Sequence, residues 1–166
     1  PLYDWKAMKK NRYAWWVTRI KATLDCVDYI RIDHFRGFES YWSVPAGEKT
    51  AIIGEWKPGP AQALFRVLQH ELGEMPILAE DLGLITDAVH KLRDDFNLPG
   101  MRILQFAFDQ NEAGKEGGTN IFLPHMYNTN CIAYTGTHDN ATLQGWLNEA
   151  DELEKKLIAA YAGFEE

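Results

Sequence analysis

Short apolar runs alternate with helical stripes along this chain, and this alternation limits the fold more than any other feature. The runs lie at 28–33, 76–80, 101–106 and 131–136 and are rich in Ile, Val and Leu. Between Asn11 and Cys26, apolar residues recur at spacings of three and four, which is typical of one helix face. Strands that alternate with helices predict parallel pairing with crossover helices. We therefore predict an α/β fold of about four βα units, roughly half of a (β/α)8 TIM barrel.

Proline, glycine and capping residues indicate where the helices begin and end. Pro60 suits a first helical turn and Gly73 suits a helix end, which predicts a helix between them. Thr86 is a candidate cap for the helix that follows. Two helices are expected at about 140–148 and 151–162, the second with Asp151/Lys155 and Glu152/Lys156 pairs. The connection from Phe35 to Gly59 is rich in aromatic residues, Pro and Gly, which favours a packed functional loop.

Composition argues against several classes of partner. The net charge is -7 and no block of Lys and Arg is present, whereas nucleic acids and anionic membranes are bound mainly through clustered positive charge. No apolar run approaches the ~20 residues that span a bilayer, and no signal pattern opens the chain. We expect a cytoplasmic protein without nucleic-acid or membrane partners. Cys26 and Cys131 lack metal-ligand spacing and are predicted to be buried thiols.

Three carboxylates follow apolar runs and are the strongest candidates for chemistry. Asp33 closes the first run, Glu80 closes the second, and Asp139 lies just beyond the fourth. In a parallel α/β barrel, catalytic side chains come from the carboxyl ends of several strands, so these three are expected to converge. Carboxylates grouped around a sugar cleave and transfer glycosidic bonds.

The sequence neighbours of two of these carboxylates suggest different tasks. Arg31 and Asp33 lie two residues apart and so share a strand face, where the guanidinium would keep Asp33 ionised as a nucleophile. A purely structural ion pair is an equal alternative. Glu80 ends an apolar strand beside Asp81, and desolvation with nearby negative charge would hold it protonated as an acid. Its alternative role is a cap for the turn around Gly83.

Asp139 and the aromatic residues each have a structural alternative. Asp139 stands beside His138 and would also serve as the N-cap of the next helix. Sugar rings pack their C–H faces on aromatic planes, and several aromatic residues are candidates for this contact, although core packing is favoured for any single one. These residues are Trp42, Phe106, Phe122 and Tyr134.

Seven segments together form a specific set of motifs. They are Pro1-Leu2-Tyr3-Asp4-Trp5, Arg31-Ile32-Asp33-His34-Phe35-Arg36-Gly37-Phe38, Ala79-Glu80-Asp81-Leu82-Gly83, Leu98-Pro99-Gly100-Met101, Gln105-Phe106-Ala107-Phe108, Phe122-Leu123-Pro124-His125 and Tyr134-Thr135-Gly136-Thr137-His138-Asp139-Asn140. This set resembles the 4-α-glucanotransferases, or amylomaltases, of glycoside hydrolase family 77 in the α-amylase clan. The likeness runs from the first residue to about Trp146.

The resemblance implies a role for each motif residue. Asp33 corresponds to the nucleophile, Glu80 to the general acid/base, and Asp139 to the carboxylate that grips sugar hydroxyls in the donor subsite. Substrate-binding roles are implied for Arg31, His34, His138, Phe106 and Asp81. The family resemblance implies no cofactor and no metal. The implied substrates are α-1,4-glucans, such as maltooligosaccharides and amylose, and glucose.

The same resemblance implies that residues 1–166 belong to the C-terminal half of a single catalytic barrel. Its reaction would transfer a glucan segment to the 4-hydroxyl of an acceptor by a retaining double displacement. Because the chain starts with Pro1 inside a motif, we expect a piece of a longer protein that is inactive and self-associating by itself. The alternatives are a hydrolase of the same clan, a non-catalytic glucan-binding or structural fragment, and, more remotely, a metal-dependent hydrolase built on Asp33, His34, Glu80 and His138.

Overall fold

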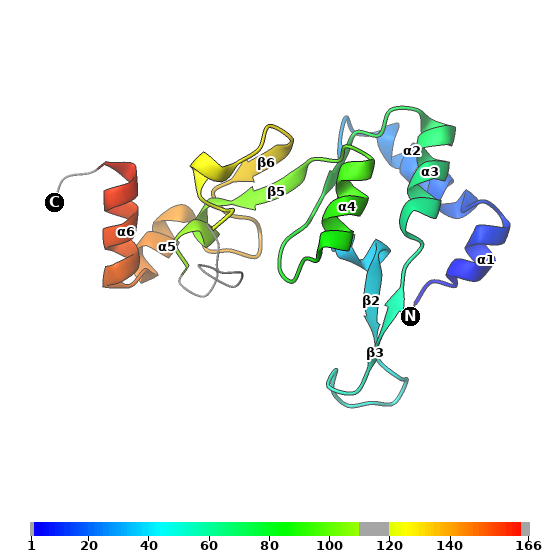
Figure 1. Cartoon of the computed structure of the whole chain (residues 1–166), viewed down its shortest axis with the longest axis horizontal. Helices are drawn as coiled ribbons and strands as arrows, with labels where there is room; N and C mark the ends of the chain where they lie inside the picture. The colour runs from blue at the N-terminus through cyan, green and yellow to red at the C-terminus, as the bar shows by residue number, and fades with distance from the viewer. Residues whose placement is uncertain (1, 110–119, 164–166) are drawn as a thin grey trace. The chain divides into compact units, whose positions relative to one another are not determined.

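The computed structural model describes residues 2–109 and 120–163. The chain divides into two compact units, Pro1–Gly100 and Met101–Glu166. Helices and short strands alternate along the chain, which is a mixed α/β arrangement (Figure 1). The prediction that residues 1–166 form a single domain stays a prediction, and the two units are described separately below.

The first unit contains one parallel strand pair that carries two of the candidate carboxylates. β1 (Ile30–Ile32) pairs with β4 (Ile77–Ala79), and the register joins Ile30 to Ile77 and Ile32 to Ala79. The parallel pairing predicted for the first two apolar runs is thereby confirmed. The other elements of this unit are α1 (Trp5–Lys10), α2 (Ala14–Leu24), a 3-10 helix η1 (Phe35–Phe38), β2 (Ser40–Ser43), β3 (Glu55–Pro58), α3 (Ala61–Leu72) and α4 (Asp87–Asp95).

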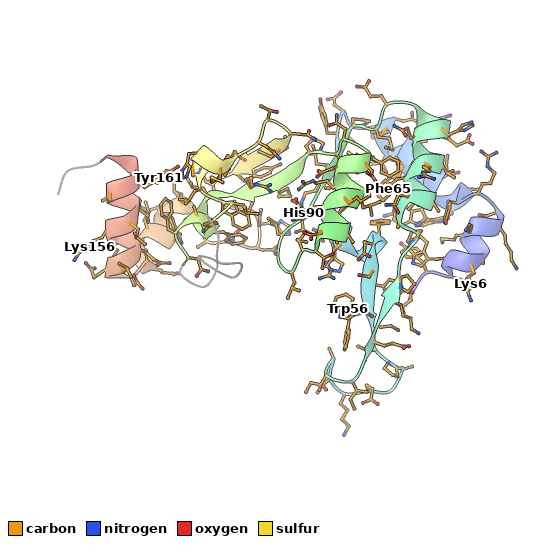
Figure 2. The ribbon with its side chains drawn as sticks, viewed as in Figure 1. Lys6, Trp56, Phe65, His90, Lys156 and Tyr161 are labelled. Atoms are coloured by element: carbon orange, nitrogen blue, oxygen red, sulfur yellow. The ribbon has the colours of Figure 1, made fainter. Side chains whose placement is uncertain are left out.

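The core of the first unit forms where the helices cover this strand pair. Leu64, Phe65 and Leu68 of α3 are fully buried at spacings that lie on one helix face. They join buried residues of β4 and α4 in one apolar cluster, in which Phe65 packs 5.5 Å from the rings of Phe35, Phe38 and Phe96. Figure 2 labels Phe65 on α3. Full burial of each such side chain is worth about 1.5 to 3 kcal/mol, so this cluster fixes the strands that carry the site.

The predicted ends of α3 are confirmed, and those of α4 in part. Pro60 occupies the N-cap of α3, and Gly73 ends it with a φ of 72°, a value that favours glycine. Thr86 is the N-cap residue of α4, as expected, but its side chain makes no capping hydrogen bond. The position was readable from the sequence, whereas the side-chain contact was not.

The prediction of one packed loop over residues 35–59 is wrong. After η1, the chain forms an antiparallel hairpin in which β2 and β3 pair from Ser40 with Pro58 to Ser43 with Glu55. Trp42 and Trp56 lie opposite each other with ring centroids 5.5 Å apart. Both indoles are partly exposed. The reason is that facing aromatic residues stabilise an antiparallel pair, which outweighs the Pro and Gly content of the segment.

The second unit begins within a strand shorter than predicted. β5 (Gly100–Ile103) pairs with β6 (Cys131–Tyr134), and the backbone then turns into the 3-10 helix η2 (Leu104–Ala107), which carries Phe106. The run predicted as a strand over 101–106 therefore ends at Ile103. A 3-10 helix η3 (Pro124–Met126) and the helices α5 (Leu143–Glu149) and α6 (Glu152–Ala162) follow.

Two further expectations concern the last helix and the thiols. Asp151 accepts hydrogen bonds from the first turn of α6 in a capping box with Glu154, and Lys155 lies 3.5 Å from Glu152, a pair that was not predicted. Cys26 is exposed and Cys131 is only partly buried, because Cys26 lies in the turn after α2 and Cys131 at the start of a two-stranded sheet. The prediction of buried thiols is wrong.

No helix within residues 2–109 and 120–163 is long and apolar enough to cross a membrane. The cytoplasmic location stays a prediction.

Candidate active site

Strand pairing places Asp33 and Glu80 at the same end of the β1–β4 pair. Ile32 and Ala79 are the last paired residues, so Asp33 and Glu80 are the next residue of each chain. The backbone amide of Glu80 donates to the Ile32 carbonyl at 3.0 Å, and the Glu80 carbonyl accepts from the Phe35 amide at 3.1 Å. The backbone bonds thus continue past the strands and hold the two residues next to each other at the carboxyl ends.

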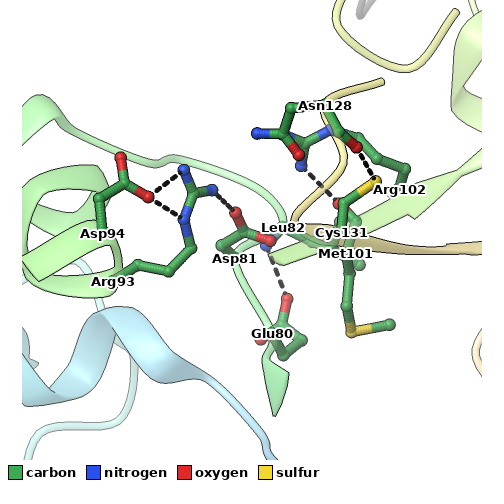
Figure 3. A network of polar contacts seen from close by, with 9 residues as sticks. All are labelled: Glu80, Asp81, Leu82, Arg93, Asp94, Met101, Arg102, Asn128 and Cys131. Carbon is green, nitrogen blue, oxygen red and sulfur yellow. Dashed lines mark hydrogen bonds and ion pairs between the residues drawn. The ribbon is translucent and has the colours of Figure 1, made fainter. Parts of the chain in front are cut away.

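The Glu80 carboxylate bonds to the backbone on both sides of this strand end. Its Oε2 accepts from the His34 amide at 2.8 Å, next to Asp33, and its Oε1 accepts from the Leu82 amide at 2.9 Å. Figure 3 shows the second contact. The alternative of a turn cap near Gly83 is therefore present in the structure, and Gly83 has the left-handed φ of 82° that such a turn uses. The same bonds hold Glu80 against the Asp33 turn, so capping and catalysis are compatible.

Asp33 is open to solvent and paired with Arg31. The side chain of Asp33 is 74% exposed, and its Oδ1 lies 2.7 Å from Nη2 of Arg31. The prediction that these two residues share a strand face and meet is confirmed. The contact is a charge-assisted pair that orients the Asp33 carboxylate beside Arg31.

Asp81 does not have the environment predicted for it. Its side chain is 1% exposed and forms an ion pair with Nη1 of Arg93 on α4, whose other side binds Asp94 (Figure 3). Burial lowers the pKa of Arg93, but the contacts with Asp94 and Asp81 outweigh it, so that the pKa is raised overall. The charge of Asp81 is therefore compensated by Arg93. It does not act on Glu80 as an unpaired negative neighbour, and we assign Asp81 a structural role instead of the substrate contact implied by the resemblance.

An aromatic cavity opens beside Asp33. Its volume is about 320 Å³, within the range of small-molecule sites. Asp33 and His34 contribute the polar part of its wall. The remaining wall is mostly aromatic and consists of Leu2, Tyr3, Trp5, Trp16, Gly37, Phe38 and Tyr41. An aromatic wall next to a carboxylate suits a sugar, which presents apolar C–H faces and hydroxyl edges.

The ring of His34 is placed on this cavity by an unusual backbone conformation. His34 has a φ of 49° and a ψ of 51°, which costs energy for a residue other than glycine. Its ring packs over Gly37, where an added Cβ would lie 3.1 Å from Cδ2 of His34. Sequence reasoning named His34 but missed Tyr3, Trp16 and Tyr41 as wall residues. The aromatic content near the N-terminus was the available signal.

In the second unit, Asp139 lies in a short loop that is held by its own polar residues. Oδ1 of Asn140 accepts from the amide of Thr137 at 2.8 Å and from its hydroxyl at 3.0 Å. The N-cap role considered for Asp139 is wrong, because α5 begins at Leu143 and Thr142 caps it. The loop projects the Asp139 side chain into solvent, where it is 76% exposed and lies 3.4 Å from His138.

The predicted aromatic candidates fall into two groups. Phe106 is partly buried and meets the buried Phe122 edge to face at 5.3 Å. Trp42 and Tyr134 are more exposed, at 39% and 38%. Core packing therefore describes Phe122, as favoured, while the other three aromatic side chains keep solvent-exposed surface.

Among the residues that the structure describes, no group of three or more His, Cys, Asp or Glu is arranged to hold a metal ion.

Comparisons with known proteins agree with these motifs. A family model described as 4-alpha-glucanotransferase matches residues 1–166. The chain is 52% identical to a 4-alpha-glucanotransferase of Synechocystis over 98% of this chain and 32% of that protein. It is 47% identical to a chloroplastic/amyloplastic 4-alpha-glucanotransferase of Solanum tuberosum, over 97% of this chain and 27% of that protein. The chain thus spans about a third of the length of these relatives.

A solved structure is similar throughout the chain. The amylomaltase from Streptococcus agalactiae in complex with acarbose superposes with a TM-score of 0.89 and 38% identity, over 97% of this chain and 32% of that one. At this identity the likeness extends from fold to family.

Proposed function

This chain belongs to the 4-α-glucanotransferases of glycoside hydrolase family 77, and on that premise we propose that it supplies the nucleophile and the acid/base of a glucan-transferring enzyme. The enzyme would transfer segments of α-1,4-glucans, such as maltooligosaccharides and amylose, to the 4-hydroxyl of another glucan or of glucose. Similar proteins carry this activity in their names, and the complexed relative binds acarbose.

One observation carries the proposal. The carboxylate of Glu80 accepts a hydrogen bond from the amide of His34, the residue directly after Asp33, at the shared end of two paired parallel strands. Two acidic residues at neighbouring strand ends, one of them beside a guanidinium, support the assignment of the pair that a retaining glycosidase uses.

The reaction proceeds in two displacements. Glu80 donates its proton to the glycosidic oxygen while the ionised Asp33 attacks the anomeric carbon, so that the bond to the leaving glucan breaks and a covalent glycosyl ester forms. The 4-hydroxyl of the acceptor then attacks the same carbon and gives its proton to Glu80. Asp33 leaves as a carboxylate, and the anomeric configuration is retained.

The other site residues bind the sugar. The aromatic cavity beside Asp33 would hold a glucosyl ring against its wall, with His34 at the edge. We propose that Asp139 and His138 bind sugar hydroxyls in the donor subsite, and that Phe106 stacks on the acceptor side, as the resemblance implies.

We also propose that both units belong to one (β/α)8 barrel. The parallel β1–β4 pair, the alternation of strands with helices and the likeness to an amylomaltase over 97% of the chain support this arrangement. In such a barrel, all the strand ends that carry candidate residues would face one mouth.

Maltotriose tests the proposed activity. The full-length gene product that contains residues 1–166 is incubated with maltotriose, and the products are separated by size. Transfer predicts glucose together with oligosaccharides longer than maltotriose. Glucose and maltose without longer products would instead identify a hydrolase of the same clan, and unchanged maltotriose would favour a binding or structural role.

A further inference from the structure

A buried arginine follows the candidate nucleophile in the sequence. Arg36 belongs to η1, three residues after Asp33, and is 8% exposed. Its Nη1 donates to the carbonyl of Leu84 in the segment after β4, and its guanidinium carbon lies 4.3 Å from the ring centroid of Trp56 on β3. One side chain therefore joins η1, the β2–β3 hairpin and the segment that begins with Glu80.

We propose that Arg36 is a positioning residue that holds the segment from Glu80 to Leu84 against the Asp33 turn and thereby sets how well Glu80 transfers its proton. This inference rests on the proposed function, because it assigns a second layer of support to the same acid. Arg36 acts through Glu80 and does not line the cavity beside Asp33.

The segment after β4 is anchored at Asp81 by the buried pair with Arg93 and at Ile85 by packing against the core. Glu80 binds the Leu82 amide inside the segment, and Gly83 turns the backbone with its positive φ. The side chain of Leu84 does not anchor this end by packing, since Leu84 is 76% exposed. The bond from Arg36 to the Leu84 carbonyl adds a direct link from η1 to the end of the turn that Glu80 begins.

The face of the guanidinium packs on Trp56, which is itself held by the β2–β3 hairpin. Trp56 meets Trp42 at 5.5 Å, and Nε1 of Trp42 donates to the Ala51 carbonyl at 2.8 Å. At the hairpin base, the amide of Gly59 donates to the Glu39 carbonyl at 2.7 Å. A planar guanidinium stacks on an aromatic face and donates from its edge at the same time, whereas a lysine ammonium lacks this planar geometry.

The burial of Arg36 is costly, which favours a specific role. Within residues 2–109 and 120–163, Arg36 has no carboxylate in ion-pair contact, and its buried Nε lacks a hydrogen-bond partner. A buried cation without a counter-charge is destabilising, and an apolar side chain would fill the same space at lower cost. The arginine is explained by the two contacts that only a guanidinium makes together.

Leaving-group chemistry separates positioning of the acid from general support of the fold. Maltotriose needs protonation of its leaving oxygen, whereas α-maltosyl fluoride releases fluoride without an acid. If Arg36 positions Glu80, its loss slows the first reaction far more than the second. A displacement of about 1 Å can cost ~100-fold in rate, so we expect Arg36→Met to lower maltotriose turnover by about that factor and to leave first-turnover fluoride release nearly unchanged.

The experiment compares Arg36→Met, Arg36→Lys and Trp56→Leu in the full-length gene product, with Arg12→Met as the control. Arg12 is an exposed arginine paired with Glu71, and its replacement should change neither rate. Arg36→Lys keeps a donor for Leu84 and should restore part of the maltotriose rate. Trp56→Leu removes the stacking contact and the packing on Trp42 but keeps the Arg36–Leu84 bond, and it should give a smaller loss with the same preference for the fluoride donor.

Equal losses with both donors would overturn the inference, because they would show general damage instead of misplacement of the acid. If Arg36→Met gives no cooperative thermal unfolding transition, Arg36→Lys and Trp56→Leu decide, and unchanged donor ratios in both would overturn it too. Failure of the proposed function is distinct, since the unmodified protein would then produce no longer oligosaccharides from maltotriose.

Discussion

Different contacts hold the two regions that carry the candidate carboxylates. Asp33 and Glu80 lie at a strand end, whereas Asp139 lies in a loop. At the first, the Glu80 carboxylate itself bonds to the backbone after both strands, through His34 and Leu82. At the second, Asn140 holds the loop by accepting two bonds from Thr137, and the Asp139 carboxylate makes an exposed contact with His138.

Only the part of the site that carries Asp33 and Glu80 is built by contacts of its own carboxylates. Asp33 and Glu80 are adjacent because strand register and side-chain bonds place them so within one unit. Asp139 is presented by a loop whose shape does not depend on its carboxylate. Replacing Glu80 should therefore disturb both chemistry and local structure, whereas replacing Asp139 should disturb sugar binding alone.

The largest expected effect follows replacement of Glu80 by Gln in the full-length gene product. General acid catalysis is worth about 10² to 10⁴ in rate, so Glu80→Gln should lower maltotriose turnover by that range and spare first-turnover fluoride release from α-maltosyl fluoride. The amide oxygen of Gln keeps one acceptor for His34 or Leu82. Equal losses with both donors would mean that Glu80 only supports the turn.

Breaking the buried Asp81–Arg93 pair should have the next largest effect. Removing one partner of a buried ion pair typically costs about 3 to 5 kcal/mol, and the low end is expected here because the exposed Asp94 still binds Arg93. Asp81→Asn should therefore lower the free energy of unfolding by about 3 kcal/mol, measured by denaturant titration. Asp94→Asn is the matched control, because Asp94 binds the same arginine from a side chain that is 59% exposed. Similar losses for both would contradict the structural role of Asp81.

A smaller effect is expected from the Asp139 loop. Asn140→Ala removes the acceptor of two bonds from Thr137, and a hydrogen bond contributes about 1 kcal/mol. Maltotriose turnover should fall about fivefold to tenfold as the loop loses its shape. Asn140→Asp keeps the acceptor and should retain most of the rate. An unchanged rate in Asn140→Ala would show that the loop is held by other contacts.

The smallest effect is expected at a surface pair away from the site. The hydrogen bond from Lys91 lowers the pKa of Asp95 below its ordinary value of 3.8. Because the folded pKa is lower than the unfolded one, this contribution to stability is present above pH 3.8 and disappears as the pH falls through the lowered value. Asp95→Asn should cost slightly in thermal stability at neutral pH and nothing at low pH. A loss that persists in acid would point to packing instead of charge.

The sequence predicted the strand pair and its helices because their signals are local and repeated. Apolar runs, helical spacing, Pro60 and Gly73 each indicate the same elements, and the paired strands then bring Asp33 and Glu80 together. The Arg31–Asp33 contact was also predictable, since two residues on one strand face are neighbours.

Contacts between distant segments were not readable in the same way. Asp81 finds Arg93 on the next helix, and Arg36 finds Leu84 and Trp56, only after the chain has folded. The hairpin at 40–58 was missed because its strands have four residues each and lie among Pro and Gly. The aromatic wall at the N-terminus was visible as composition, but its place beside Asp33 depends on tertiary packing.

In the proposed reaction, Asp33 attacks the sugar while Glu80 acts as acid and base. The most direct test traps the glycosyl ester in the full-length gene product with a slow fluorinated maltosyl donor, followed by proteolysis and mass spectrometry. We expect one sugar label, on the peptide that contains Asp33, and no label in Asp33→Asn. A label on Glu80, Asp139 or any other carboxylate would contradict it.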